Sequence, residues 1–319
     1  MSAGWWALLL ASLLLFLALG DAPERTLFWD AFFDAGHLPL FGLVALAILG
    51  LLRAGSAPAD HPRTWWLAFV LTVTLGALTE ILQVFQPNRD VSIEDFLRDV
   101  AGAGAFLLMA AAVGFRKPAC GPVRTAAGRA TAAVVSGLLL VAASAHLATT
   151  VALYVERSQA FPTLFALDGS WWERRLIDAN ASVLTPRTRP LHQEMPFDEP
   201  LARLDLKPGT FPGLAFNEPY PDWSRSRSLA FTIVSDLEAA LPLTIRVHDA
   251  AHDQRTEDRF NRSLVINPGV NRVVIPLDEV RHAPDRREMD MRRIRGIILF
   301  GYRLTKPTHV YVSAIRLVD

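Results

Sequence analysis

The two halves of the chain differ in how their apolar residues are arranged. Up to about residue 155, long apolar runs alternate with short polar clusters, and these runs cover about residues 5–20, 38–53, 64–86, 99–115 and 131–154. A helix needs roughly 20 apolar residues to cross the core of a bilayer. The third and fifth runs reach that length, and the other three reach it with flanking residues. The pattern predicts a membrane α-helical bundle of about five transmembrane helices.

The first run has a second interpretation, as a cleaved signal peptide with Ala18-Leu19-Gly20 as the cleavage site. However, its first six residues, MSAGWW, include no lysine or arginine, and four further apolar runs follow. A signal peptide ordinarily begins with a positively charged region. A retained first helix is therefore favoured.

The loops between the runs predict an orientation. Basic residues are concentrated at the second and fourth loops: Arg53, Arg63, Arg116, Lys117, Arg124 and Arg129. Loops rich in lysine and arginine stay in the cytoplasm. We therefore expect a multi-pass protein of a bacterial-type inner membrane, with a cytoplasmic N-terminus and an extracytoplasmic, periplasmic region after Tyr154.

From about residue 161 onward, short alternating segments separated by Pro-Gly and other turn residues replace the long runs. Eight segments have the pattern of strands: residues 181–186, 202–206, 228–236, 242–250, 262–267, 271–277, 295–304 and 309–318. Eight short strands at this spacing predict an all-β sandwich of the jelly-roll type. We expect a four-helix domain over 1–120, a cytoplasmic loop and fifth helix over 121–160, and the sandwich over 161–319.

Composition excludes several classes of function. The 319 residues carry no formal net charge, which gives no support for a nucleic-acid partner. The single cysteine, Cys120, excludes an intrachain disulfide framework and a cysteine-rich metal site. A structural calcium ion fits a sandwich of this kind, but no EF-hand ligand string is present, so no cofactor is predicted. No common catalytic motif is present, and whether the chain is an enzyme stays open.

The stretch TEILQVFQPNRDVSIEDFLRD, residues 79–99, places many ionisable groups between two apolar runs. Glu80 would lie ~7 Å from the middle of its helix, at 1.5 Å per residue, and therefore still within the hydrocarbon. A carboxylate there is costly unless it points into the bundle toward a partner. These considerations predict a polar membrane site made of Asp34, His37, Glu80, Gln83, Arg89, Asp95 and Asp99.

The spacing of these residues resembles the VanZ-like membrane proteins, named after a teicoplanin-resistance determinant. Residues 5–116 carry the resemblance through His37, Glu80-x-x-Gln83, Pro87, Arg89, Ser92, Asp95 and Asp99-x-x-Gly102. The family usually has Asp-Lys before the histidine and Asn in place of Asp99, so this site is more acidic. The resemblance implies a membrane bundle in a cell-envelope, glycopeptide-resistance-like setting.

Three roles for the polar membrane site remain open. It could be a salt-bridged network that fixes helix packing, or a site for the head group of a lipid or lipid-linked saccharide. A histidine with paired carboxylates could also carry out acid–base or metal-assisted chemistry.

In the second half, FPGLAFNEPYPDWS, DRFNRSLVINPGVNRVVIPLDEV and HVYVSAIRLV resemble the galactose-binding-like sandwich of many carbohydrate-binding modules. The resemblance implies a fold more firmly than a ligand. Sugar binding needs flat aromatic faces and planar polar groups, and the candidates are Trp171, Trp172, Tyr220, Trp223, Asp249, Asp258, Arg259 and Asn261. Core packing is the alternative for the tryptophans, and a solvated strand edge or internal Asp–Arg pairing is the alternative for the DRFNR stretch.

We therefore expect a membrane protein of the cell envelope whose outward-facing sandwich recognises envelope or exported polysaccharide. The bundle would serve as the anchor in the lipid bilayer and as a site for a lipid-linked intermediate. One alternative is an enzyme acting on a lipid-linked glycan, with His37, Glu80, Asp95 and Asp99 doing the chemistry. The other is a scaffold subunit without a ligand.

Overall fold

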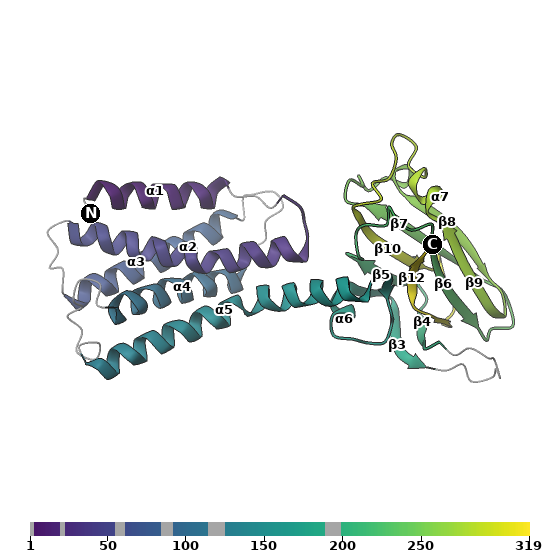
Figure 1. Ribbon diagram of the computed structural model, residues 1–319, viewed down its shortest axis with the longest axis horizontal. Helices are drawn as coiled ribbons and strands as arrows, with labels where there is room; N and C mark the ends of the chain where they lie inside the picture. Colours follow the sequence, from purple (N-terminus) through teal and green to yellow (C-terminus); the bar gives the residue numbers. More distant parts are fainter. Residues whose placement is uncertain (1–2, 20–22, 55–60, 84–91, 114–124, 189–198) are drawn as a thin grey trace. The chain divides into compact units, whose positions relative to one another are not determined.

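The computed structural model describes residues 3–19, 23–54, 61–83, 92–113, 125–188 and 199–319 (Figure 1). The chain divides into two compact units, Met1–Ala152 and Leu153–Asp319. The first unit is helical and the second consists mainly of strands.

Five long helices are present among the described residues: α1 Ala3–Leu19, α2 Leu27–Ala54, α3 Pro62–Gln83, α4 Ile93–Ala112 and α5 Ala126–Ala160. Three of them, α2, α3 and α5, are long and apolar enough to cross a membrane. The five expected helices are therefore present, and three of them meet the length and hydropathy of a membrane span within the described residues. The helix α1 has only 17 residues, and α4 carries Glu94, Asp95, Arg98 and Asp99 in its first two turns.

The helix α2 packs against α1, α3 and α4, and small residues set how closely they approach. A Cβ atom added to Gly102 of α4 would lie 2.2 Å from the carbonyl oxygen of Leu38 of α2. A Cβ atom added to Gly42 of α2 would lie 2.4 Å from the Phe106 ring, and one added to Gly50 would lie 2.2 Å from the Trp6 ring. Glycines at helix contacts let backbones approach, as is typical of membrane bundles.

The long apolar helices also present large apolar side chains outward. Only 11% of the most apolar window of α5 is buried, and Leu138 and Val141 are 64% and 71% exposed. On α3, Trp66 and Ile81 are exposed as well. Contiguous exposed apolar surface of this kind is characteristic of contact with a membrane or a partner.

The second unit is a sandwich of two antiparallel sheets. One has seven strands, in the order β1-β12-β6-β11-β4-β3 with β9 also paired to β6, and the other has five, in the order β2-β5-β10-β7-β8. The strands are β1 Thr163–Phe165, β2 Ile177–Asn180, β3 Ser182–Thr188, β4 Leu201–Leu206, β5 Gly213–Asn217, β6 Ser228–Ser235, β7 Leu241–Asp249, β8 Phe260–Ile266, β9 Gly269–Pro276, β10 Ile294–Phe300, β11 Thr308–Val312 and β12 Ile315–Val318. The short helices are α6 Glu173–Leu176, η2 Thr256–Asp258 and α7 Leu277–Arg281.

The eight expected strands are all present, but the strand count was too low. The strands β1, β2 and β5 are additional, and each has only three to five residues. The expected strand 309–318 is divided into β11 and β12, which both pair with β6. Ser313 lies at the division, where Thr232 N–H donates to its Oγ at 2.8 Å and its own N–H donates to Thr232 O at 2.9 Å. The division is therefore a β-bulge.

The core of this unit lies between the two sheets, with Phe216, Trp223, Ile233 and Ile297 fully buried. Leu153, in the last turns of α5, belongs to the same cluster. Those turns also make polar contacts with the sandwich: the Tyr154 hydroxyl donates to the Glu218 carboxylate, and Arg157 Nη1 donates to Glu218 O at 2.9 Å. The sandwich unit thus begins within α5, eight residues before the expected start at residue 161.

Candidate functional site

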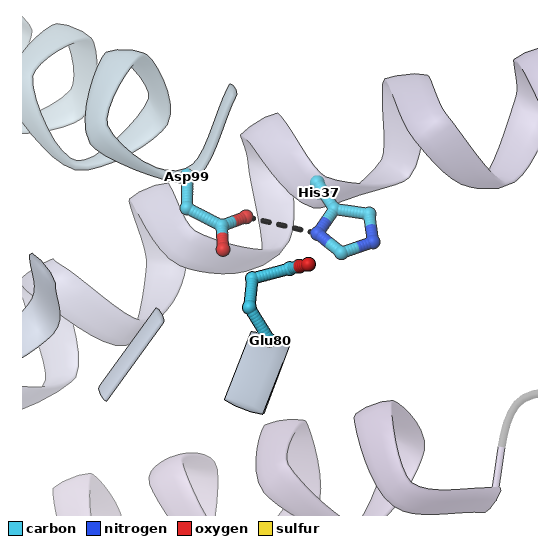
Figure 2. A group of neighbouring side chains, drawn as sticks. All are labelled: His37, Glu80 and Asp99. Carbon is cyan, nitrogen blue, oxygen red and sulfur yellow. Dashed lines mark hydrogen bonds and ion pairs between the residues drawn. The ribbon is translucent and has the colours of Figure 1, made fainter. Parts of the chain in front are cut away.

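In the helical unit, three helices bring His37, Glu80 and Asp99 together (Figure 2). His37 Nδ1 of α2 lies 2.9 Å from Asp99 Oδ1 of α4. Glu80 of α3 and Asp99 are only 4% and 1% exposed. The His37 ring also stacks on Phe41, one turn further along α2, with ring centroids 6.2 Å apart. A buried carboxylate is tolerated only with partners, and the histidine is one for Asp99.

Glu80 joins the end of α3 to the start of α4. Its Oε2 accepts a hydrogen bond from the backbone N–H of Ser92 at 3.1 Å. Ser92 is the N-cap of α4, and its Oγ accepts from Asp95 N–H at 3.2 Å. Negative charge is favourable at a helix N-terminus, where backbone N–H groups lack partners within the helix.

A second set of contacts surrounds Arg98, on the second turn of α4. Its guanidinium lies 3.3 Å from Asp34 of α2 and 3.4 Å from Glu94, and it also pairs with Asp95. The Arg98 side chain is only 14% exposed. The first turns of α4 are therefore joined by polar contacts to both α2 and α3.

The structure thus places His37, Glu80 and Asp99 in one group, and Asp34 and Asp95 around Arg98. The Gln83 side chain and Arg89 lie outside the described residues. Sequence reasoning missed Arg98, although its spacing of three and four residues from Asp95 and Glu94 is a helical ion-pair signal.

The donor atoms of His37, Glu80 and Asp99 all lie within 4.8 Å of one another. One imidazole and two carboxylates could hold a divalent cation such as Zn²⁺ or Mn²⁺. The contacts that the structure documents are those of a network that joins three helices. Gly76 contributes to it, since a Cβ atom there would lie 3.0 Å from Asp99 Oδ2.

In the sandwich, most of the expected sugar contacts have structural roles. Trp172 and Trp223 are 6% and 0% exposed, so their faces are not available to a ligand. Trp223 Nε1 donates to Tyr220 O at 2.7 Å, and the Tyr220 ring packs against Phe161 with centroids 4.6 Å apart. Trp171 is 42% exposed. Core packing, the alternative weighed for the tryptophans, describes Trp172 and Trp223.

Asp249 and Asp258 are held by one guanidinium. Arg287 contacts Asp249 at 2.5 and 2.8 Å, and Asp258 at 2.6 and 3.0 Å. Burial alone would raise the pKa of Asp249, but hydrogen bonds from Arg287 and the Asp290 N–H hold that pKa below its usual value. The hydrogen bonds from Arg287 likewise lower the pKa of Asp258. Both carboxylates are therefore ionised and internally paired.

His252, Asp253 and Asp258 form a second group of side chains that could ligate a metal ion. This group shares Asp258 with the Arg287 pair.

A groove that the sequence did not predict crosses the outward face of the five-stranded sheet. Its volume is about 310 Å³, and it is lined by Asn180, Phe211, Gly213, Leu214, Ala215, Arg246, Ile298 and Phe300. The strand register places Ala215, Ile298 and Arg246 in one row across the sheet, and Gly213 beside Phe300 in the next. Gly213 and Ala215 of β5 are small, so they leave room for the groove beside the larger Phe300 and Ile298.

One wall of this groove is aromatic and carries polar groups at its rim. Phe211, 49% exposed, lies 5.7 Å from the Phe300 ring and 5.4 Å from the Tyr302 ring. The Arg246 guanidinium lies over Phe300, 5.4 Å from its centroid, and Asn180 Nδ2 donates to Phe211 O at 2.7 Å. An apolar concave surface with a few placed polar groups is the usual form of a ligand site.

Two of the expected residues lie beside this groove. Asn261 pairs in register with Arg246, and its Oδ1 accepts from Arg246 Nε at 3.4 Å. Arg259 precedes β8 and is two residues from Asn261, so it lies toward the same face of the sheet. The candidate sugar contacts Arg259 and Asn261 are therefore near the groove, whereas its aromatic residues Phe211 and Phe300 were not among the candidates.

No protein-family model matches the chain, and no curated protein shows significant similarity to it. Similar solved structures include the family 11 carbohydrate-binding module from Clostridium thermocellum in complex with a β-1,3-1,4-mixed-linked tetrasaccharide. It is 15% identical, with a TM-score of 0.36 over 49% of this chain and 94% of that one. An exo-β-agarase is 20% identical, with a TM-score of 0.37 over 49% of this chain and 25% of that one. A family 30 carbohydrate-binding module of a Clostridium thermocellum cellulosomal cellulase is 16% identical, with a TM-score of 0.31 over 45% and 86%. Similarity at this level assigns no ligand to this chain.

Proposed function

We propose that this protein is a membrane-anchored glycan-binding protein of the cell envelope. The groove on the five-stranded sheet binds a segment of an envelope or exported polysaccharide, and the apolar helices hold the protein in the bilayer. The groove, with its aromatic wall beside Arg246 and Asn180, is the observation that carries this proposal.

The chemistry of the groove suits a sugar ring. A pyranose has an apolar face of C–H groups, which packs on flat aromatic rings such as Phe211 and Tyr302. Its hydroxyl groups need planar donors and acceptors, and Arg246, Asn180 and Asn261 supply guanidinium and amide groups at the rim. Because the groove lies on a sheet face, a polysaccharide chain can continue beyond it on either side.

The exposed apolar surfaces of α3 and α5 support the anchoring part of the proposal, since a bilayer would cover them. The basic residues at the second and fourth loops support a cytoplasmic N-terminus and an outward-facing sandwich. The VanZ-like resemblance of residues 5–116 remains a prediction. The grouping of His37, Glu80 and Asp99 supports this resemblance, and a site for a lipid-linked saccharide at these three residues is part of the same prediction.

The test is retention of the full-length protein, in detergent or nanodiscs, on a panel of envelope polysaccharides in affinity electrophoresis. The variant Phe211→Ala should lower affinity about tenfold or more, because it removes the exposed aromatic face. The matched control is Val274→Ala, which truncates an exposed apolar residue on β9 of the other sheet. Absence of retention on every polysaccharide would remove the proposal.

A further inference from the structure

Two arginines beside the groove have no acidic partner. Within the described chain, no carboxylate lies within 4.0 Å of the guanidinium of Arg246 or Arg259. Neighbouring arginines differ: Arg262 pairs with Glu279 at 2.7 Å, and Arg287 holds Asp249 and Asp258. Arg262 and Arg287 are thus ion-paired, whereas Arg246 and Arg259 have no carboxylate at ion-pair distance, and the charge of Glu257 acts on Arg259 from farther away.

The contacts of both guanidiniums are with neutral groups. Arg246 Nε donates to Asn261 at 3.4 Å and its guanidinium lies over the Phe300 ring. Arg259 Nη2 donates to Thr256 Oγ1 at 3.2 Å, and its Nε is buried without a hydrogen-bond partner in the part of the chain that the structure describes. These contacts leave hydrogen-bonding capacity on both side chains, since a guanidinium has five N–H donors.

The electrostatic environment of these arginines also favours a bound anion. Burial lowers the pKa of both guanidiniums; the charge of Arg259 lowers the pKa of Arg246 further, whereas the charge of Glu257 partly offsets the effect on Arg259. Burial also lowers the pKa of His248 to about 4, and His252, Arg246 and Arg259 add to that effect. Two like charges thus lie close together, partly removed from water. A bound anion would relieve this unfavourable arrangement.

Charged side chains lie at both ends of the row of residues that crosses the sheet. Arg246 lies on β7, and Asp178 lies in the same row on the edge strand β2, beside Ala215. Asp178 accepts a hydrogen bond from Asn217 Nδ2 at 2.6 Å. The groove is therefore polarised along the row of residues that crosses the sheet.

We propose that the groove takes an anionic polysaccharide, whose carboxylate or sulfate group is bound by Arg246 and Arg259 while its sugar ring packs on the exposed rings of Phe211 and Tyr302. This inference rests on the proposed glycan-binding function and adds the class of glycan. The planar guanidinium matches a carboxylate or sulfate with two parallel hydrogen bonds, which a neutral hydroxyl cannot provide.

The test compares three polysaccharides with full-length protein in nanodiscs, by isothermal titration calorimetry and affinity electrophoresis. Polygalacturonate is the carboxylated probe, dextran sulfate the sulfated probe and a mixed-linked β-glucan the neutral one. The protein should bind at least one anionic probe more tightly than the neutral glucan, and the two anionic arms distinguish carboxylate from sulfate. Raising salt from about 50 to about 500 mM should weaken the anionic interaction, because salt screens exposed charges.

Arg246→Gln and Arg259→Gln should each lower affinity for the anionic probe about 10- to 100-fold, as expected for the loss of a charge-assisted hydrogen bond. Arg272→Gln is the matched control, since it removes the same charge from an exposed position on β9 of the other sheet and should change little. Thermal unfolding of each variant checks that the sandwich remains folded.

Tighter binding of the neutral glucan would overturn the anionic assignment while leaving glycan binding in place. An equal loss of affinity in Arg272→Gln would show that the overall charge of the protein attracts the anionic probe. That result would overturn the proposed site at Arg246 and Arg259. Failure to bind any of these probes or any polysaccharide of the envelope panel would remove both proposals.

Discussion

Glu80, near the end of α3, accepts a hydrogen bond from the backbone N–H of Ser92, the residue that caps α4. The contact spans twelve residues of sequence and fixes the start of one helix to the end of another. His37 and Asp99 then fix the same turns of α4 to α2, as seen in Figure 2. The most charged part of the helical unit is therefore where three helices are joined.

Replacement of Glu80 tests the role of this junction. Glu80→Leu should lower the stability of the helical unit by about 1–3 kcal/mol, because it leaves the Ser92 N–H without its acceptor. Glu80→Gln keeps an oxygen acceptor at the same place and should cost less. Thermal unfolding in detergent and the amount of protein in membranes measure both. Normal accumulation and unfolding of Glu80→Leu would show that the junction is not needed for folding, and would favour a ligand site.

Gly102 tests the close approach of α4 to α2. Gly102→Ala places a Cβ atom 2.2 Å from the carbonyl oxygen of Leu38, so the helices must separate, at a cost of about 1–3 kcal/mol. Gly137→Ala is the control, because a Cβ atom on that α5 glycine meets nothing within 4 Å. Equal unfolding temperatures for the two variants would show that α4 and α2 do not pack this closely at Gly102.

Arg287 should be the most sensitive charged position of the sandwich. Arg287→Leu leaves Asp249 buried without its cation, and loss of one partner of such a pair costs about 3–5 kcal/mol. Arg286→Leu removes the same kind of side chain from the neighbouring exposed position and should stay within about 0.5 kcal/mol of the parent. Chemical denaturation followed by tryptophan fluorescence gives both values. A small effect for Arg287→Leu would mean that Asp249 finds another partner.

His248 makes the stability of the sandwich depend on pH. Its pKa is about 4 in the folded state and near 6.5 when the chain is unfolded, so the unfolded state binds more protons between these values. Stability should fall as pH decreases from about 6.5 to about 4, by up to about 3 kcal/mol from this group. His248→Gln should remove that part of the pH dependence.

Asp249 and Asp258 change the stability of the sandwich at lower pH than His248 does. Asp249 and Asp258 have lowered pKa values, so the stability that they contribute is fully present above pH 3.8 and is lost as pH falls further. Unfolding curves measured from pH 7 to pH 3 separate the two effects. A parent and a His248→Gln variant with the same slope between pH 6.5 and 4 would contradict the assignment to His248.

Sequence reasoning worked where burial imposes a strong pattern. The strand β6 was predicted within one residue, because its alternating residues face a buried core. The short strands β1, β2 and β5 offer too few residues for alternation to appear. Glu80 was singled out because a charge within an apolar run is costly unless it has partners, and Asp99 through the resemblance of Asp99-x-x-Gly102 to the VanZ-like pattern.

The groove could not be predicted in the same way. Phe211, Arg246 and Phe300 become neighbours only because β5 and β7 both pair with β10. That register depends on the whole sheet and leaves no local trace in the sequence. Phe211 looks like an ordinary turn residue between Gly209 and Gly213, and Arg246 looks like one polar position among several on a half-exposed strand.

The attachment of the last turns of α5 to the sandwich bears on how the binding unit can be excised. A fragment beginning at residue 161 would remove Leu153 from the core and would take the Tyr154 hydroxyl and the Arg157 guanidinium away from Glu218, which is only 8% exposed. A fragment beginning near residue 150 retains all three. Soluble preparations for crystallisation or glycan screening should therefore include this helical stub, and the shorter version should aggregate or unfold at a lower temperature.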